Sequence, residues 1–207
     1  MAGTGNTAPH SAGATVKQKI AATFELFFLF GRGIKPFEKE GTKYHALRSL
    51  WLPVVAAPLA FYSAWLYPPQ GLEKETYSTI ASVLAGFTIV SFVVGTALGY
   101  LFSWAFDRRE RFWLWFHVGN WMTVPNTLIA IPILALAVLG NHERDVMDRA
   151  FSIVLYYGVI VNACVAFRAF KVDWTLAGFF ACMSIYAAQK VWNLMFWLND
   201  VPIKWFG

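Results

Sequence analysis

The chain has 207 residues, of which 57% are apolar, 18% aromatic and 14% charged, and its net charge is +5. A soluble domain carries about 25% charged residues, so this chain has too few charges to cover a water-facing surface. The composition excludes an ordinary soluble enzyme domain, a disordered chain and a disulfide scaffold, because the chain has two cysteines and many large apolar side chains. The positive net charge is not a nucleic-acid signal, and we expect no nucleic-acid partner.

The first 49 residues are predicted to lie outside the membrane core. Residues 1–16 are small and polar, which predicts a flexible tail and not a secretory signal. The apolar run IAATFELFFLF that follows has eleven residues, too few to span a bilayer. Residues 17–49 are therefore predicted to form a cytoplasmic, interfacial segment with an amphipathic helix in the headgroup layer. Its predicted contacts with anionic lipid are Lys17, Lys19, Arg32 and Lys35.

Residues 50–198 contain five stretches that approach the roughly 20 apolar residues needed for a membrane helix. Short breaks between them hold nearly all of the remaining charge. The sequence therefore predicts an all-α fold, a polytopic helical bundle of five transmembrane helices preceded by the interfacial helix. Residues 199–207 would form a short tail. The predicted spans are residues 50–67, 79–106, 112–139, 151–167 and 174–198.

Lysine and arginine predict the orientation of these spans. Twelve of them fall in the N-terminal segment and in the loops that share its side, and four fall on the opposite side. Because cytoplasmic loops carry an excess of Lys and Arg, we expect a cytoplasmic N-terminus and a periplasmic C-terminus. The predicted location is a bacterial inner membrane.

Small residues recur every four positions along the second predicted span. Such spacing lets two helices approach closely, which is a main source of attraction between helices in lipid. The pattern predicts either packing against another span of the same chain or an oligomer seam. The residues are Ser91, Gly95, Gly99 and Ser103.

Polar side chains in the last three spans are candidates for an intramembrane site, because such groups are costly in lipid. They are His117, Asn120, Asn126, Asn162 and Lys190. Each also has a structural interpretation. His117 lies near the cytoplasmic end and could reach headgroups or loop carbonyls, the asparagines could bond neighbouring helices, and Lys190 could extend to the interface.

Catalytic and metal-binding patterns are missing from the sequence. The four histidines fall in four different segments without metal-ligand spacing, and the two cysteines lie in different spans. Phosphate-binding, nucleophile-elbow and zinc-protease motifs are absent. We therefore expect no enzyme activity, no cofactor and no metal.

The order of features resembles a known family. The basic segment FELFFLFGRGIKPFEKEGTKYHALRSLWLPVVAAPLAFY runs into the first span, a glycine-rich span follows, and then VPNTLIAIPILAL and YYGVIVNACVAFRAFKVDWTLAG. This pattern, over residues 24–198, resembles the bacterial branch of the Yip1-domain membrane proteins, a five-span family with a cytoplasmic N-terminus. The acidic-Tyr-Gly-Pro signature of the eukaryotic members is absent. The resemblance implies a non-enzymatic protein that works through partners or lipids.

Two competing functions follow as hypotheses, and a third, lipid or membrane-shape binding through the N-terminal interfacial segment, is compatible with the first. The first is an accessory or scaffold subunit that packs with membrane lipids and with other membrane-protein subunits or a second copy of itself. The alternative is a small-solute or ion pathway through spans three to five. It would run along Asn120, Asn126, Asn162 and Lys190.

Overall fold

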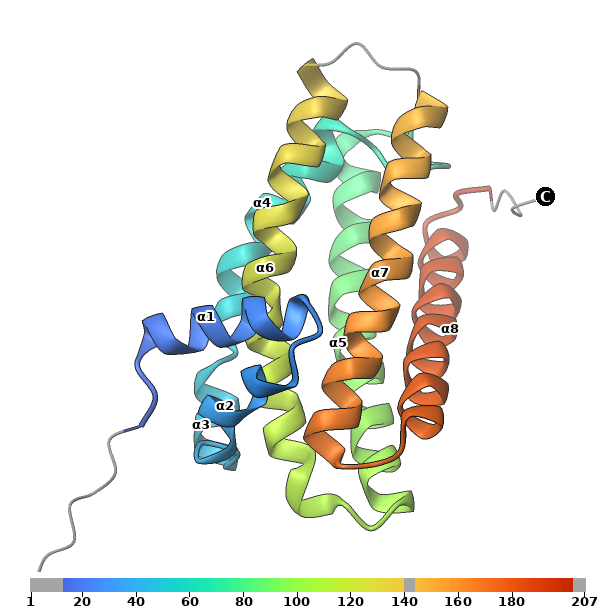
Figure 1. Cartoon of the computed structure of the whole chain (residues 1–207). Coiled ribbons are helices and arrows are strands. Elements are labelled where there is room, and N and C mark those ends of the chain that lie inside the picture. Colours follow the sequence, from blue (N-terminus) through green and yellow to red (C-terminus); the bar gives the residue numbers. More distant parts are fainter. Residues whose placement is uncertain (1–12, 140–143, 203–207) are drawn as a thin grey trace, which may run out of the picture.

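The protein is a helical bundle, seen in a computed structural model that describes residues 13–139 and 144–202 (Figure 1). Within those residues there is no β-strand, so the predicted all-α class is confirmed. The long helices are α4 (Trp51–Leu66), α5 (Tyr77–Ala105), α6 (Phe112–Leu139), α7 (Arg144–Phe170) and α8 (Trp174–Leu198). The shorter elements are α1 (Val16–Phe27), η1 (Gly31–Ile34), α2 (Lys35–Glu38), α3 (Lys43–Arg48) and η2 (Arg109–Arg111).

Membrane-spanning character is supported by the outer surface of the bundle. In the described part of the chain, four helical stretches are long and apolar enough to cross a membrane. In the most apolar window of α5, 11% of the residues are buried within the protein, so most of this apolar surface faces outward. Such a surface is expected in lipid and not in water. The four stretches are Lys43–Leu66, Tyr77–Ala105, Arg109–Leu136 and Val146–Phe170.

The fifth predicted span corresponds to α8, which has 25 residues but is not among these four. It runs beside α5 and α7 (Figure 1) and packs against both. The helix bounds agree with the predicted stretches within two residues except for α7, which begins seven residues earlier than predicted. Residues 144–150 are helical as well, because charged residues such as Arg also have a good helix propensity and a helix does not require apolar side chains.

Side-chain caps determine where several helices begin. Thr76 caps α5 by accepting a hydrogen bond from the Thr79 backbone N–H, and Asp173 caps α8 in the same way at Leu176. At α1, Thr15 and Gln18 form a capping box in which each side chain bonds the other residue's backbone N–H. These contacts satisfy N–H groups that have no partner inside the helix.

The N-terminal segment packs on the bundle. In Figure 1, α1 lies across the long helices, part-way along α6. Its apolar face forms one buried cluster with α6 and α7 residues well inside those helices, two to three turns from the start of α6. The opposite face, including Lys17, is exposed. α1 is thus a helix with one buried face, and that face contacts protein. The predicted place of this helix in the headgroup layer stays a prediction. The cluster includes Ala22, Leu26, Phe27, Val118, Trp121, Met122, Val161 and Val165.

Aromatic side chains hold the long helices together near the α5–α6 turn. Trp115 of α6 stacks on Phe170 of α7, with ring centroids 5.6 Å apart. Phe102 of α5 and Phe180 of α8 complete the cluster. Because rings of this size bury large areas and favour edge or offset contacts, this cluster fixes the spacing of α5, α6, α7 and α8.

Two predictions concern residues that the structure describes only in part. The predicted flexible tail covers residues 1–16, of which residues 1–12 lie outside the described residues. The predicted C-terminal tail covers 199–207, of which residues 203–207 lie outside them.

Candidate functional site

A charged cluster is buried where the N-terminal segment meets α6. Glu40, just after α2, points its Oε2 at the Nζ of Lys19 on α1, 2.5 Å away. The same oxygen lies 3.6 Å from Nε2 of His117 on α6 and 3.8 Å from Nδ1 of His45 on α3. Glu40 is 3% exposed and His117 is 2% exposed. The cluster therefore joins three parts of the N-terminal segment to α6, which is distant in the sequence.

The electrostatic environment of Glu40 favours its charged form. Burial raises the pKa of the Glu40 carboxyl, but Lys19 and the nearby imidazoles of His45 and His117 lower it by more, so the pKa lies below 4.5. A buried carboxylate is tolerated when a cation is paired with it. Here the Lys19 ammonium is that cation. The ion pair therefore attaches α1 to the connection between α2 and α3.

His117 is covered by protein. The sequence placed it within reach of headgroups or loop carbonyls, and this interpretation is corrected, because the N-terminal segment covers the His117 ring. Phe37 makes an edge contact with the ring at 5.6 Å between centroids. Neither ring nitrogen has a hydrogen-bond partner among the described residues. Sequence reasoning missed Glu40 and His45 as partners, since their approach depends on how the segment folds back onto α6.

Asn120 also serves to attach the N-terminal segment. Its Nδ2 donates to the hydroxyl of Ser49 at 3.0 Å and to the backbone carbonyl of Ala46 at 3.4 Å. Asn120 is 6% exposed. The asparagine thus bonds a neighbouring element, as one of the two sequence interpretations had it.

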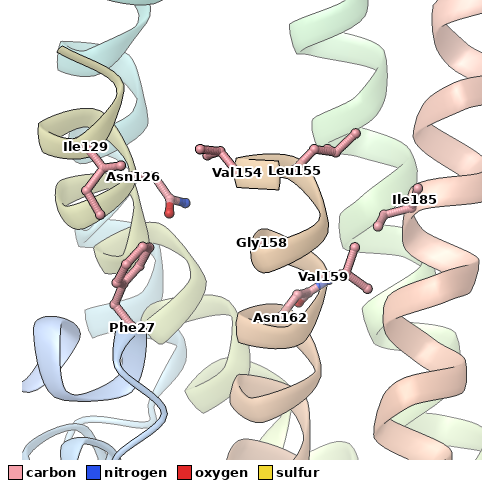
Figure 2. Close-up of a pocket in the computed structure, with 9 residues that line it drawn as sticks. All are labelled: Phe27, Asn126, Ile129, Val154, Leu155, Gly158, Val159, Asn162 and Ile185. Carbon is pink, nitrogen blue, oxygen red and sulfur yellow. The ribbon is translucent and has the colours of Figure 1, made fainter. Parts of the chain in front are cut away.

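Asn126 and Asn162 come together at a groove between α6 and α7, which we call the amide groove. Figure 2 shows Asn126 directed from α6 toward α7, with Gly158 and Asn162 on the facing helix. Neither asparagine side chain makes a hydrogen bond within the described part of the chain, and Asn126 is exposed. The groove has a volume of about 280 Å³ and is lined by Phe27, Asn126, Ile129, Val154, Leu155, Gly158, Val159, Asn162 and Ile185.

The amide groove has no charged side chain in its lining, and its wall is open at Gly158. Its lining residues are two amides, one glycine and six apolar side chains. A Cβ atom added to Gly158 would meet no described atom within 4 Å, so the wall at this position is open. Unpaired amides in an apolar environment cost free energy, and a group that enters the groove with a donor or acceptor would remove that cost.

A cavity of about 570 Å³ lies between α4, α6 and α7, and it shares Leu155 with the amide groove. Several of its polar groups are already engaged. The Tyr67 hydroxyl donates to Asp148 at 3.0 Å, and the Ser63 and Ser152 hydroxyls donate to backbone carbonyls one turn earlier. These hydroxyl groups are therefore already used within the bundle, whereas the two asparagines of the amide groove make no hydrogen bond to a described residue.

Lys190 lies apart from the other candidate polar residues. It is exposed on α8, with its ammonium 5.1 Å from the centre of the Tyr186 ring. A cation over an aromatic face is stabilised by the ring quadrupole. The structure thus brings two of the five predicted polar residues into one groove, while Lys190, His117 and Asn120 lie elsewhere.

The small-residue pattern of α5 is used in part within the chain. Gly99 packs against Trp115 of α6 so closely that a Cβ atom there would lie 2.2 Å from the indole ring. Ser103 is completely buried. Ser91 and Gly95 line a small hollow between α4, α5 and α6, and a Cβ on Gly95 would meet no described atom within 4 Å. Gly99 and Ser103 therefore act in intramolecular packing.

The predicted lipid contacts divide into two groups. Lys17, Arg32 and Lys35 are exposed, although Arg32 is paired with Glu25 at 2.9 Å. The prediction for Lys19 is corrected, because its ammonium is turned inward onto Glu40 and its side chain is 13% exposed.

Comparison with known proteins gives no relative. No protein-family model, curated protein or solved structure matches the chain. The resemblance to Yip1-domain proteins therefore stays a prediction. Among the described residues, no group of three or more His, Cys, Asp or Glu side chains is arranged to hold a metal ion.

Proposed function

We propose that the chain is a non-enzymatic accessory subunit that holds a transmembrane helix of a partner subunit in the amide groove. The observation that carries this proposal is the pair Asn126 and Asn162, which face an open groove on the long helices without a hydrogen-bond partner in the described part of the chain. A side chain that leaves its hydrogen-bonding capacity unused in lipid is destabilising. A partner that supplies the missing bonds recovers that free energy.

A helix suits the groove better than a lipid chain does. Association of helices in membranes relies on small residues that allow close approach and on Asn, Gln, Ser and Thr side chains that bond across the interface. The open position at Gly158 provides the first and the two amides provide the second. An acyl chain would fill the volume but could not bond to Asn126 or Asn162.

The proposal includes a membrane arrangement. In this arrangement the chain crosses a bacterial inner membrane five times, with α8 as the fifth span, so its two termini lie on opposite sides. The N-terminus is in the cytoplasm and the C-terminus is in the periplasm. The distribution of Lys and Arg in the sequence supports this orientation. A five-span chain with a cytoplasmic N-terminus is also what the Yip1-like pattern implies, and a role through partners or lipids is consistent with it.

The pathway hypothesis has less support from the geometry. It requires polar groups continuous across the membrane, but Asn120 bonds Ser49 and Lys190 lies over Tyr186 on another face. Asn126 and Asn162 remain as a local pair. A pair of neutral amides fits a docking surface better than a continuous route.

The experiment is native mass spectrometry of the protein extracted gently from its own membrane. We expect the wild-type chain to carry a second membrane subunit, and Gly158→Leu to lose that subunit because the leucine side chain occupies the groove. Gly178→Leu is the matched control, since a Cβ atom added to Gly178 on α8 also meets no described atom within 4 Å and this residue lies outside the groove. A wild-type chain that emerges as a bare monomer contradicts the proposal.

A further inference from the structure

A second hollow lies between α1 and α2, the two short helices drawn close together in Figure 1. Its volume is about 420 Å³. Gln18 and Glu25 of α1 line one side, and Lys35 of α2 and Lys39, just after α2, line the other. Small apolar surface from Ala21, Ala22 and Pro36 completes the lining. The hollow thus combines polar walls with an apolar portion.

The acidic residues of this segment are each paired elsewhere. Glu25 pairs with Arg32 at 2.9 Å, Glu38 with Arg111 at 3.7 Å and Glu40 with Lys19 at 2.5 Å. Residues 1–12 contain no Asp or Glu in the sequence. Lys35 and Lys39 make no ion pair with any described residue, and both are exposed. The hollow therefore carries a local positive charge.

Gln18 adds a directed donor. Its Oε1 accepts a hydrogen bond from the Thr15 backbone N–H at 2.8 Å as part of the capping box. This bond fixes which end of the amide is used, so the two N–H groups of Nε2 remain to donate to another molecule. A ligand in the hollow would meet two ammonium groups and one amide NH₂.

We propose that this hollow binds the phosphate headgroup of an anionic membrane lipid. A phosphate has several acceptor oxygens and a negative charge, which suit two lysines and an amide donor. The apolar lining is suited to the glycerol and the first part of the acyl chains. Lys35 and Lys39 are the contacts, while Lys19 and Arg32 are occupied by their own carboxylates. This inference does not depend on the proposed partner helix.

The test measures lipid binding to the full, purified chain by native mass spectrometry. The probe is dioleoyl phosphatidylglycerol, with dioleoyl phosphatidylcholine as the zwitterionic comparison, whose net charge is zero. Each lysine near an anionic headgroup contributes about fivefold in affinity. We expect Lys35→Gln/Lys39→Gln to weaken phosphatidylglycerol binding at least tenfold, with phosphatidylcholine binding unchanged. The control Lys43→Gln/Arg48→Gln removes the same charge from exposed residues of the same segment outside the hollow and should change binding less than twofold.

Three results would overturn the inference. Equal losses in the two double variants would mean that the segment acts by overall charge and not through this hollow. Unchanged phosphatidylglycerol binding in Lys35→Gln/Lys39→Gln would exclude this hollow as the binding site. Displacement of the lipid by millimolar inorganic phosphate would assign the site to free phosphate. The measurement uses the isolated chain, so it is independent of whether a partner helix occupies the amide groove.

Discussion

The ammonium of Lys19 lies 2.5 Å from the carboxylate of Glu40, whose side chain is 4% exposed. This ion pair connects α1 to the turn after α2, and His117 of α6 lies 3.6 Å from the same carboxylate oxygen. The N-terminal segment is therefore attached to the bundle by a buried charge pair as well as by its apolar face.

Removing one member of this pair should destabilise the fold. Glu40→Gln keeps the shape of the side chain but leaves the Lys19 ammonium buried without its anion, which costs about 3 kcal/mol in the free energy of unfolding. Chemical unfolding in detergent measures the loss. Lys19→Met/Glu40→Met should recover most of it, because two apolar side chains leave no unpaired charge. The explanation would be contradicted if the double variant lost as much free energy of unfolding as Lys19→Met and Glu40→Met lose together.

Acid should weaken the same attachment. The pKa of Glu40 in the folded protein lies below its ordinary value of 4.5. A group with a lowered pKa contributes stability that is present above the unfolded value and lost as the pH falls through the folded value. The difference in melting temperature between wild type and Glu40→Gln should therefore be constant above about pH 5 and shrink below about pH 4.5. A difference that persists undiminished to pH 3 would refute this assignment.

Two glycines on α5 should respond in opposite ways to the same substitution. Gly99→Ala places a Cβ atom against Trp115, at 2.2 Å from the ring before any relaxation, and should cost about 1–3 kcal/mol. Gly95→Ala adds a Cβ in open space and should stabilise the helix by up to about 1 kcal/mol. Thermal unfolding of both variants tests the difference. Equal effects on stability would mean that the close contact between Gly99 and Trp115 does not require a glycine.

The end of α1 should loosen when one hydroxyl is removed. The Tyr157 O–H on α7 donates to the backbone carbonyl of Phe27 at 2.5 Å. Tyr157→Phe deletes that bond, at a cost of about 1 kcal/mol, and should speed hydrogen exchange in residues 24–34. Tyr156→Phe is the matched control, because Tyr156 is 70% exposed. Identical exchange in the two variants would show that this bond does not hold α1.

Much of the bundle follows directly from the sequence. The apolar runs and the charged breaks predict the helices at 112–139 and 174–198 with the observed bounds, because length and hydropathy are local properties. The four-residue spacing of Gly99 and Ser103 is also a local property, and it predicts close helix packing. The start of α7 was predicted too late, since its first seven residues include four charged ones yet are still helical.

The candidate sites depend on contacts that no local pattern carries. Glu40 lies in a segment of mixed charge, and nothing in its spacing indicates that it faces His117, 77 positions away in the sequence. The apolar face of α1 indicates an amphipathic helix but not whether lipid or protein covers it. Asn126 and Asn162 were candidates by residue type, and their meeting at one groove is a tertiary result. Gly158 was not singled out, because its importance comes from the empty space beside it.

The measurement that tests the central claim most directly is photocrosslinking in the native membrane from the amide groove. Benzoylphenylalanine in place of Val154, an exposed side chain that lines the groove, should crosslink to a transmembrane helix of another subunit, at a peptide that contains an Asn, Gln, Ser or Thr residue. The same probe in place of Gly178 should not reach that helix. Adducts from position 154 that contain lipid alone, or a pattern identical to that from position 178, would contradict the proposal that this groove holds a partner helix.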